Sequence, residues 1–260
     1  RRGNLLAAWH LDTGKFVQVG KSADESVTPM RRSNTAYVAE WSAYAMDRSI
    51  GRPAADLYLA NLETGARTKL KDKINDGDAQ LGPSGKFLLY LQDDQFSVMN
   101  LATKAVTNLT KTIPTSFVDK ESDATIKQKP DFGVAGWAKD DAAVLLYDKF
   151  DIWKVPTDGS KAQKLTDGAS EQVRHRLLRI GQEEDWLDLS KPLYVSLFGT
   201  WSKKSGYGLL KPAGGVDRLV FMDKSIGGLS KAREADVYAY TMQDYDDSPD
   251  LFVGGGDLQS

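Results

Sequence analysis

Serine chemistry is the first activity that the residues could support, because the chain has no cysteine and only two histidines. A serine made nucleophilic on a sharp strand-to-helix turn needs the pattern G-x-S-x-G, which lifts the hydroxyl clear of the backbone. The sequence contains no such pentapeptide. The nearest segment is Gly228-Leu229-Ser230-Lys231-Ala232, which lacks the second glycine and has no strong apolar strand before it. We therefore expect no nucleophilic serine and no catalytic residue here.

An acidic pair beside an aromatic residue is the next candidate. Glu183, Glu184 and Trp186 lie within four consecutive residues. Paired carboxylates can hold an ammonium group, which offers three hydrogen-bond donors, so these three residues are weak candidates for substrate binding. The alternative is a solvated loop rim that precedes a blade strand at Leu187–Leu189.

The two histidines are expected to be structural. His10 lies in an alternating segment and should point to the face opposite Trp9. His175 stands between two arginines, whose charges would lower its pKa if they were close, and we expect it in an exposed basic loop. Two histidines without any cysteine do not make a multi-histidine or thiolate metal centre, so we predict no metal site and no cofactor.

Two other motifs have simpler interpretations. Four aspartates lie between Asp244 and Asp250, and calcium prefers clustered carboxylate oxygens. The spacing of a calcium loop is missing, so a hairpin loop closed by Ser248-Pro249 is expected. Asn108-Leu109-Thr110 matches a glycosylation acceptor, which has meaning only in a eukaryotic secretory context.

The composition is that of a globular chain with a proper core. The 260 residues include 34 Lys and Arg and 36 Asp and Glu, and the net charge is -2. This balance argues against a general nucleic-acid binder, and no apolar run is long enough to span a membrane. The opening Arg1-Arg2-Gly3-Asn4 has neither an initiator Met nor a signal-peptide pattern, so we expect a part of a longer protein.

One phrase recurs along the chain, made of a short strand, a turn with glycine or a polar pair, and a second short strand. The turns of five copies lie near Gly14, Gly65, Lys104, Gly159 and Gly214, and a looser sixth copy runs from Val237 to Val253. Such residues tolerate the positive φ that tight hairpins need. The pattern predicts about six hairpins.

A second phrase precedes most of these hairpins. It consists of a polar turn followed by an apolar strand, as at Tyr37–Ala39, Phe87–Leu91, Val144–Tyr147 and Leu193–Val195. Continuous apolar character predicts strands that are covered on both faces.

Together the two phrases give four strands per repeat. The turn-to-turn spacing runs from 39 residues (Gly65 to Lys104) to 55 residues (Lys104 to Gly159). We therefore predict an all-β fold, a β-propeller region over residues 1–260 with about six four-stranded blades or part-blades, out of seven or eight in the parent. The alternative is a β-sandwich, which also has short strands and regular turns.

The remaining segments are assigned to insertions and cores. The longer spacings are attributed to insertions at Met46–Ala55, Pro114–Pro130 and Ser225–Ala235. Helical periodicity is weak, and Ala169–Arg179 is the one segment to test as a helix. We expect the tryptophans at strand positions to lie in blade cores; these are Trp9, Trp41, Trp137 and Trp153.

Three segments resemble known propellers. Gly82-Pro83-Ser84-Gly85-Lys86, with the apolar strand that follows, resembles the turn of TolB-type propellers. Val134–Gly168 resembles a propeller blade of the prolyl oligopeptidase family of serine peptidases. Asp247–Val253 resembles the last propeller strand of that family. The resemblance is dispersed over about residues 5–253.

The resemblance implies a function for the parent protein. In that family a propeller covers an α/β-hydrolase domain with a Ser, Asp and His triad and limits access to peptides. Because the G-x-S-x-G turn is missing, the resemblance implies that this chain is the propeller part, with the hydrolase domain as its partner and a peptide as substrate. The order of Glu183-Glu184 and Trp186 is reversed relative to the dipeptidyl peptidases, so their role is not transferred. A periplasmic or secreted location is favoured, and a cytoplasmic one stays open.

Two other function classes remain open. A free-standing TolB-type propeller would act as a protein-interaction scaffold, without any peptidase attached. A propeller enzyme with chemistry in its central channel would need converging carboxylates or histidines, and the sequence places none.

Overall fold

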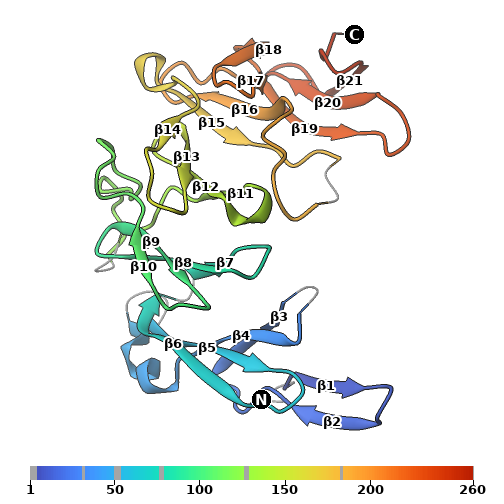
Figure 1. Cartoon of the computed structure of the whole chain (residues 1–260). Helices are drawn as coiled ribbons and strands as arrows, with labels where there is room; N and C mark the ends of the chain where they lie inside the picture. The colour runs from blue at the N-terminus through green and yellow to red at the C-terminus, as the bar shows by residue number, and fades with distance from the viewer. Residues whose placement is uncertain are drawn as a thin grey trace. The chain divides into compact units, whose positions relative to one another are not determined.

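The computed structural model describes residues 5–30, 33–49, 54–75, 79–125, 129–181 and 184–259. The chain divides into two compact units, Arg1–Thr112 with Lys120–Asp131 and Ile113–Asp119 with Phe132–Ser260. Both units consist of antiparallel strands joined by turns and short 3-10 segments (Figure 1). In the described part of the chain no helix is both long and apolar enough to cross a membrane.

The first unit contains three antiparallel sheets among its described residues. The first is the hairpin of β1 (Ala7–His10) and β2 (Lys15–Gln18). The second has the order β3 (Glu25–Pro29), β4 (Thr35–Glu40), β5 (Ala54–Asn61) and β6 (Arg67–Asn75), with the 3-10 helix η1 (Ser42–Ser49) between β4 and β5. The third has the order β7 (Ala79–Leu81), β8 (Phe87–Gln92), β9 (Gln95–Asn100) and β10 (Val106–Asn108).

The second unit likewise contains three sheets in its described part. The first has the order β11 (Val134–Trp137), β12 (Ala143–Tyr147), β13 (Ile152–Pro156) and β14 (Gln163–Lys164), with η3 (Lys139–Asp141) between β11 and β12. After η4 (Ala169–Glu171) comes a sheet of β15 (Val173–Leu177), β16 (Leu193–Gly199), β17 (Ser205–Leu210) and β18 (Val216–Met222). The last has the order β19 (Ser225–Lys231), β20 (Tyr238–Gln243) and β21 (Asp250–Gly254).

All six hairpins of the first phrase are confirmed. They are β1–β2, β5–β6, β9–β10, β13–β14, β17–β18 and β20–β21. Gly14, Gly65, Gly159 and Gly214 have φ values of 68°, 73°, 80° and 96°, so the glycines stand where the turn requires positive φ. Each sheet is therefore a meander of consecutive strands, which is the construction of a propeller blade.

The strands of the second phrase are also confirmed, and their burial follows the prediction. β4, β8 and β12 are buried along almost their whole length, while β16 alternates between buried and half-buried positions. Such strands can be buried on both faces only if each sheet has a neighbour on either side.

Apolar clusters fill the space between neighbouring sheets within each unit. In the first unit, Leu57 and Ile74 of one sheet pack with Leu88 and Tyr90 of the next. In the second unit, Leu145 packs with residues of β15 and β16 in the same way, and tyrosines of β17 and β20 form a further cluster. Three sheets follow one another in each unit, so the two-layer sandwich alternative is wrong.

A threonine clasp repeats in the two units. In the second unit, the backbone N–H of Ile152 donates to Thr166 Oγ1 (3.0 Å), and that hydroxyl donates to Asp151 Oδ1 (2.7 Å). In the first unit, the N–H of Phe96 donates to Thr110 Oγ1 (2.9 Å) in the same way. The threonine hydroxyl satisfies a buried backbone donor where the outer strand ends. Thr110 of the glycosylation motif therefore has a structural role.

Two segment predictions are wrong. Ala169–Arg179 is not a helix, because after η4 it forms strand β15, in which Val173, His175 and Leu177 face one side. The pattern was hidden because a buried histidine stands where an apolar residue is usual. Ser225–Ala235 is not an insertion, because Ser225–Lys231 is strand β19, whose two consecutive glycines lie at a bulge.

Candidate functional site

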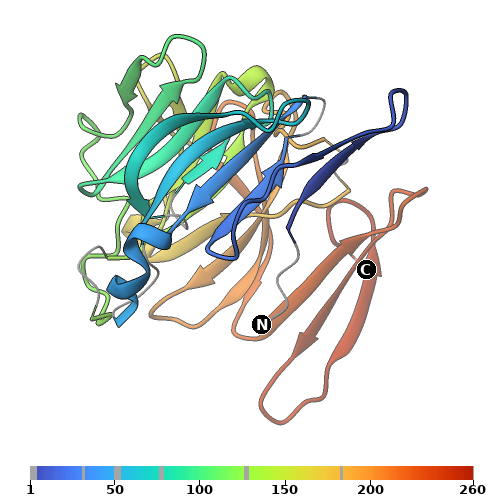
Figure 2. The ribbon, with the colours of Figure 1, turned by 90° about the horizontal axis from the view of Figure 1, so that it is seen from below.

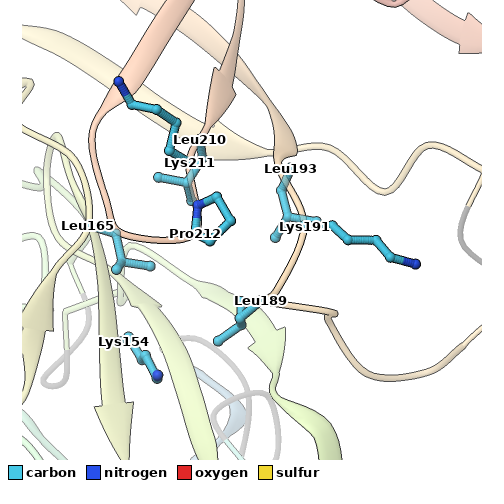
Figure 3. Close-up of a pocket in the computed structure, with 8 residues that line it drawn as sticks. All are labelled: Lys154, Leu165, Leu189, Lys191, Leu193, Leu210, Lys211 and Pro212. Atoms are coloured by element: carbon cyan, nitrogen blue, oxygen red, sulfur yellow. The ribbon is translucent and has the colours of Figure 1, made fainter.

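A groove of about 700 Å³ lies in the second unit between its first two sheets. Its lining comes from the η3 turn, the end of β13 and the loop before β16. A smaller cavity of about 40 Å³ adjoins it and shares Lys154 and Leu189 with it (Figure 3). The floor of the combined site is apolar and is made by Pro156, Leu165, Leu187, Leu189, Leu193, Leu210 and Pro212.

One backbone contact brings the loop onto the sheet. The N–H of Leu187 donates to the carbonyl of Trp137 (2.7 Å), and Ala138 and Leu187 form an isolated parallel bridge. Gly136, with φ 150°, makes room for this approach, because a Cβ there would lie 3.0 Å from Leu187 Cδ1. The loop therefore places Trp186 against the η3 turn, where Lys139 Nζ lies 5.5 Å from the centre of the indole.

The η3 turn itself is strained. Asp140 and Asp141 both have positive φ, 58° and 57°, a conformation that costs most residues other than glycine about 1–2 kcal/mol and costs aspartate less. The turn is held by Thr157, whose hydroxyl donates to the carbonyl of Asp141 (2.8 Å). Strained backbone that the surroundings hold in place is often found at binding sites.

The rim of the groove is positively charged. Of the titratable residues that line the two hollows, Lys139, Lys154, Lys191 and Lys211 are basic and Asp188 is acidic. Lys191 lies 3.4 Å from Asp188, and both side chains are largely or partly exposed, so that ion pair is weak. The described lining holds no histidine, so the groove offers charge and apolar surface for binding rather than a proton-transfer pair.

A second polar cluster in this unit is buried and structural. Asp148 Oδ1 accepts from the N–H groups of Phe150 and Asp151, and its Oδ2 accepts from Trp153 Nε1 (2.8 Å). His175 lies nearby, with 3.9 Å between its Nδ1 and Asp151 Oδ1. Burial lowers the pKa of His175, so the ring is neutral near pH 7.

Arg176 covers this cluster. Its guanidinium lies 4.4 Å from the ring centre of Tyr147 and donates to the carbonyl of Asp148 (3.1 Å). Burial, together with the neighbouring charge of Arg174, lowers the pKa of Arg176 to about 10. The carboxylates of Asp148 and Asp151 accept hydrogen bonds from nearby backbone N–H groups, and neither carboxylate lines the groove.

The predicted binding residues are only partly brought together. Glu183 lies outside the described residues. Glu184 is exposed, and Trp186 is half-buried and lines the groove. The strand expected at Leu187–Leu189 is wrong, because Leu187 makes only the bridge to Ala138.

The other candidates lie apart from the groove lining. His10 is in β1, and its Nε2 lies 3.0 Å from the carbonyl oxygen of Leu62, while Trp9 is exposed on the opposite face, as predicted for the histidine. His175 is buried in β15, so the exposed-loop interpretation is wrong. Ser230 lies within β19, where its hydroxyl donates to the carbonyl of Ala239 (3.4 Å), and not at a strand-to-helix turn.

The acidic turn between β20 and β21 is paired with a lysine. The aspartates of the β20–β21 turn face Lys224, which lies 3.5 Å from Asp244 and 3.8 Å from Asp247. No three acidic or histidine side chains of the described residues are arranged to hold a metal ion. The core prediction is right for Trp137 and wrong for Trp9, which is 68% exposed.

Sequence reasoning missed the lysines of the groove. Lys139, Lys154 and Lys191 are far apart in sequence and stand among many other surface lysines, so no local signal marks them. Pairing of β12 with β13 brings Lys154 into the sheet whose η3 turn carries Lys139, and the bridge from Leu187 to Ala138 adds the loop that carries Lys191.

Comparisons with known proteins give the fold. No family model matches the chain, and no curated protein matches its sequence. Among solved structures, a dipeptidyl aminopeptidase IV from Bacteroides ovatus is 9% identical, with a TM-score of 0.55 over 98% of this chain and 45% of its own. A prolyl endopeptidase is 12% identical, with a TM-score of 0.53 over 96% of this chain and 36% of its own. A TolB from Agrobacterium tumefaciens is 11% identical, with a TM-score of 0.43 over 99% of this chain and 88% of its own.

The fold prediction is confirmed by these findings. The chain is a β-propeller region whose described part contains four four-stranded sheets, one three-stranded sheet and one two-stranded sheet, all antiparallel. Its fold is similar to that of part of the prolyl endopeptidase and of the dipeptidyl aminopeptidase IV. It spans less than half of the length of those two peptidases.

Proposed function

We propose that this chain is the non-catalytic propeller region of a prolyl-oligopeptidase-like serine peptidase, where it limits access and positions peptides for a hydrolase domain. The observation that carries the proposal is the fold shared with two peptidases, of which the chain spans only 36% and 45%. The absence of a G-x-S-x-G sequence and the position of Ser230 within a strand agree with a region that does no chemistry itself.

The proposed mechanism divides the work between the two parts. The hydrolase domain would transfer the acyl group of the peptide to its serine and then to water. The blades would exclude folded proteins sterically, because strands buried on both faces form stiff walls. Within this proposal, Glu183, Glu184 and Trp186 stay predicted substrate contacts.

The test compares this chain with the longer product of its parent gene. Both proteins are assayed with a panel of fluorogenic peptides and with a folded protein as substrate. We expect no hydrolysis by the 260 residues alone, and hydrolysis of peptides but not of the folded protein by the longer product. Hydrolysis by the 260-residue chain, or a parent gene without a hydrolase domain, would overturn the proposal.

A second candidate is a scaffold that binds other proteins without any attached peptidase. The groove with its apolar floor and lysine rim favours this candidate, because binding there needs no second domain. A parent gene that lacks the hydrolase domain, together with a stable complex between this chain and another protein, would favour it over the peptidase.

A further inference from the structure

We infer that the lysine-rimmed groove of the second unit binds an extended acidic peptide segment that carries apolar side chains. The groove is defined by the lining given above, from Ala138 to Pro212. This inference goes beyond the proposed function, because it holds with or without a hydrolase domain.

The charge of the groove differs from that of the molecule. The whole chain has a net charge of -2, whereas the titratable residues that line the groove are four lysines and one aspartate. Lys211 is also paired with Asp217 outside the lining, at 2.8 Å, so the local charge is +2. Local charge of one sign attracts ligands of the opposite sign and speeds their association. A segment with two or more carboxylates therefore complements the rim.

Lys154 is the lysine that is shared by the two hollows. It lies on β13 and is only half-buried, and its ammonium group has no hydrogen-bond or ion-pair partner among the described residues. Its ammonium group can pair with an incoming carboxylate without first leaving an internal partner. In Figure 3 the side chains of Lys191 and Lys211 extend to opposite sides, away from the leucines and Pro212, so their ammonium groups lie at the edges of the apolar floor.

The apolar floor favours a peptide over a nucleic acid. Its leucines and prolines can accept aliphatic side chains, and burial of such side chains favours binding. A single-stranded nucleic acid would need several aromatic side chains for successive bases, and the described lining has Trp186 alone. The volume of about 700 Å³ lies in the range of ligand sites.

Trp186 is the aromatic residue of the described groove lining. Its indole is held against Lys139 and is half-buried, so it contributes flat apolar surface beside a positive charge. A peptide that lies along the floor would change the environment of this ring, and its fluorescence gives a second readout.

The test measures binding of a fluorescein-labelled peptide of alternating glutamate and leucine to the 260-residue chain by anisotropy. Comparison peptides alternate lysine with leucine, or glutamate with glutamine. We expect the glutamate–leucine peptide to bind at least about ten-fold more tightly than either comparison peptide, and to bind more weakly at about 0.5 M salt.

Matched variants locate the site. Lys154→Gln with Lys191→Gln should weaken binding about ten-fold, since each removes one rim charge. Lys161→Gln with Lys204→Gln removes the same charge from exposed positions elsewhere in this unit and should leave binding unchanged. Trp186→Ala should weaken binding without changing its salt dependence. Circular dichroism of every variant is the control for correct folding.

Three outcomes would overturn the inference. The first is no binding at about 1 mM protein, the weak end of measurable affinity. The second is equal weakening by both lysine pairs, which would indicate a nonspecific charge effect. The third is displacement of the peptide by oligothymidine at equal concentration, which would indicate a polyanion site. None of these outcomes depends on peptidase activity, so this inference and the proposed function can fail separately.

Discussion

Lys104 holds a backbone conformation that glycine holds in the equivalent hairpin. Its φ is 63°, and Gly65 has 73° at the same place in the β5–β6 turn. In both turns, this residue donates its N–H to the carbonyl of an asparagine, Asn100 or Asn61, at 2.8 Å. The two hairpins differ mainly in the side chain that the left-handed position must tolerate.

Lys104→Gly should therefore stabilise the protein by about 0.5–1 kcal/mol, because the Cβ strain is removed. Gly65→Lys is the reverse change and should destabilise by about 1 kcal/mol. Urea unfolding measures the change in the free energy of unfolding for both variants, provided that their m values equal that of the wild type. A loss of stability in Lys104→Gly would show that its side chain contributes more than its backbone costs.

His175 should make stability depend on pH in a defined window. Burial lowers its pKa, although the nearby Asp151 opposes the shift and Arg218 adds to it. The unfolded chain binds the proton more readily, so stability is fully present above the unfolded pKa of about 6.5 and declines as pH falls from there through the folded pKa.

His175→Leu should remove the decline that begins below about pH 6.5 and leave the steeper loss at acid pH, where carboxylates become protonated. Thermal unfolding between pH 7 and pH 5 tests this. Parallel pH profiles for the wild type and His175→Leu would exclude the histidine as the cause.

At the scale of elements, the threonine clasp ends the outer strand of two blades. Thr166 satisfies the buried N–H of Ile152 and donates to the carboxylate of Asp151, whereas Thr110 donates to the amide oxygen of Gln95 (3.2 Å). A hydrogen bond to a charged acceptor contributes more than one to a neutral acceptor.

Thr166→Val should cost about 2–3 kcal/mol and Thr110→Val about 1–2 kcal/mol, because each leaves a buried donor unpaired. Chemical denaturation of both variants gives the comparison, with Thr166→Ser as the control that keeps the hydroxyl. Equal losses at the two sites would contradict the role given to Asp151.

In the first unit a largely buried ion pair connects the first and last strands of a sheet. Glu25 of β3 and Arg67 of β6 make two hydrogen bonds, at 2.7 and 2.8 Å, and Arg67 also donates to the carbonyl of Val19. Burial alone would raise the pKa of Glu25, but the hydrogen bonds from Arg67 and the backbone lower it overall. Stability from this pair is present above the unfolded pKa of about 4.3 and is lost as pH falls through the lower folded value.

Glu25→Gln should destabilise the protein by about 3 kcal/mol at pH 7, since it leaves the Arg67 charge buried without its partner. The exposed Glu63→Gln is the control and should cost less than about 0.5 kcal/mol. Urea unfolding measures both. A loss in Glu25→Gln no larger than that of the control would show that water replaces the carboxylate.

At the scale of the whole molecule, the sequence predicts the blades better than the site. Glycine turns and continuous apolar strands are local signals, and the six hairpins follow from them. The groove is not local, since it depends on the bridge between Leu187 and Ala138 and on the freedom of Gly136. The sequence did not reveal β15 because a histidine and two arginines occupy the strand, and the arginine guanidinium groups lie over the rings of Phe198 and Tyr147.

The two-stranded sheet exposes a pair of aromatic side chains to solvent. Trp9 and Phe16 are opposite each other across β1 and β2 and are 68% and 69% exposed, and the tip of this hairpin projects beyond the other sheets of its unit (Figure 2). Trp9→Thr with Phe16→Thr should reduce light scattering at high protein concentration, because it removes an exposed apolar pair. Replacing the well-covered Val17 by Thr is the contrast, which should lower stability instead. Unchanged scattering in the double variant would show that this aromatic pair does not promote association.

The joining of consecutive strands in every sheet has a consequence for biosynthesis. The strands of each sheet can pair once that sheet's own residues have left the ribosome, from 12 residues for β1–β2 to 51 residues for β3–β6, with no need to wait for a distant strand. Nascent chains stalled behind successive sheets should thus acquire resistance to proteases in steps from the N-terminus onward, each sheet becoming protected when the following sheet of its unit covers its apolar face.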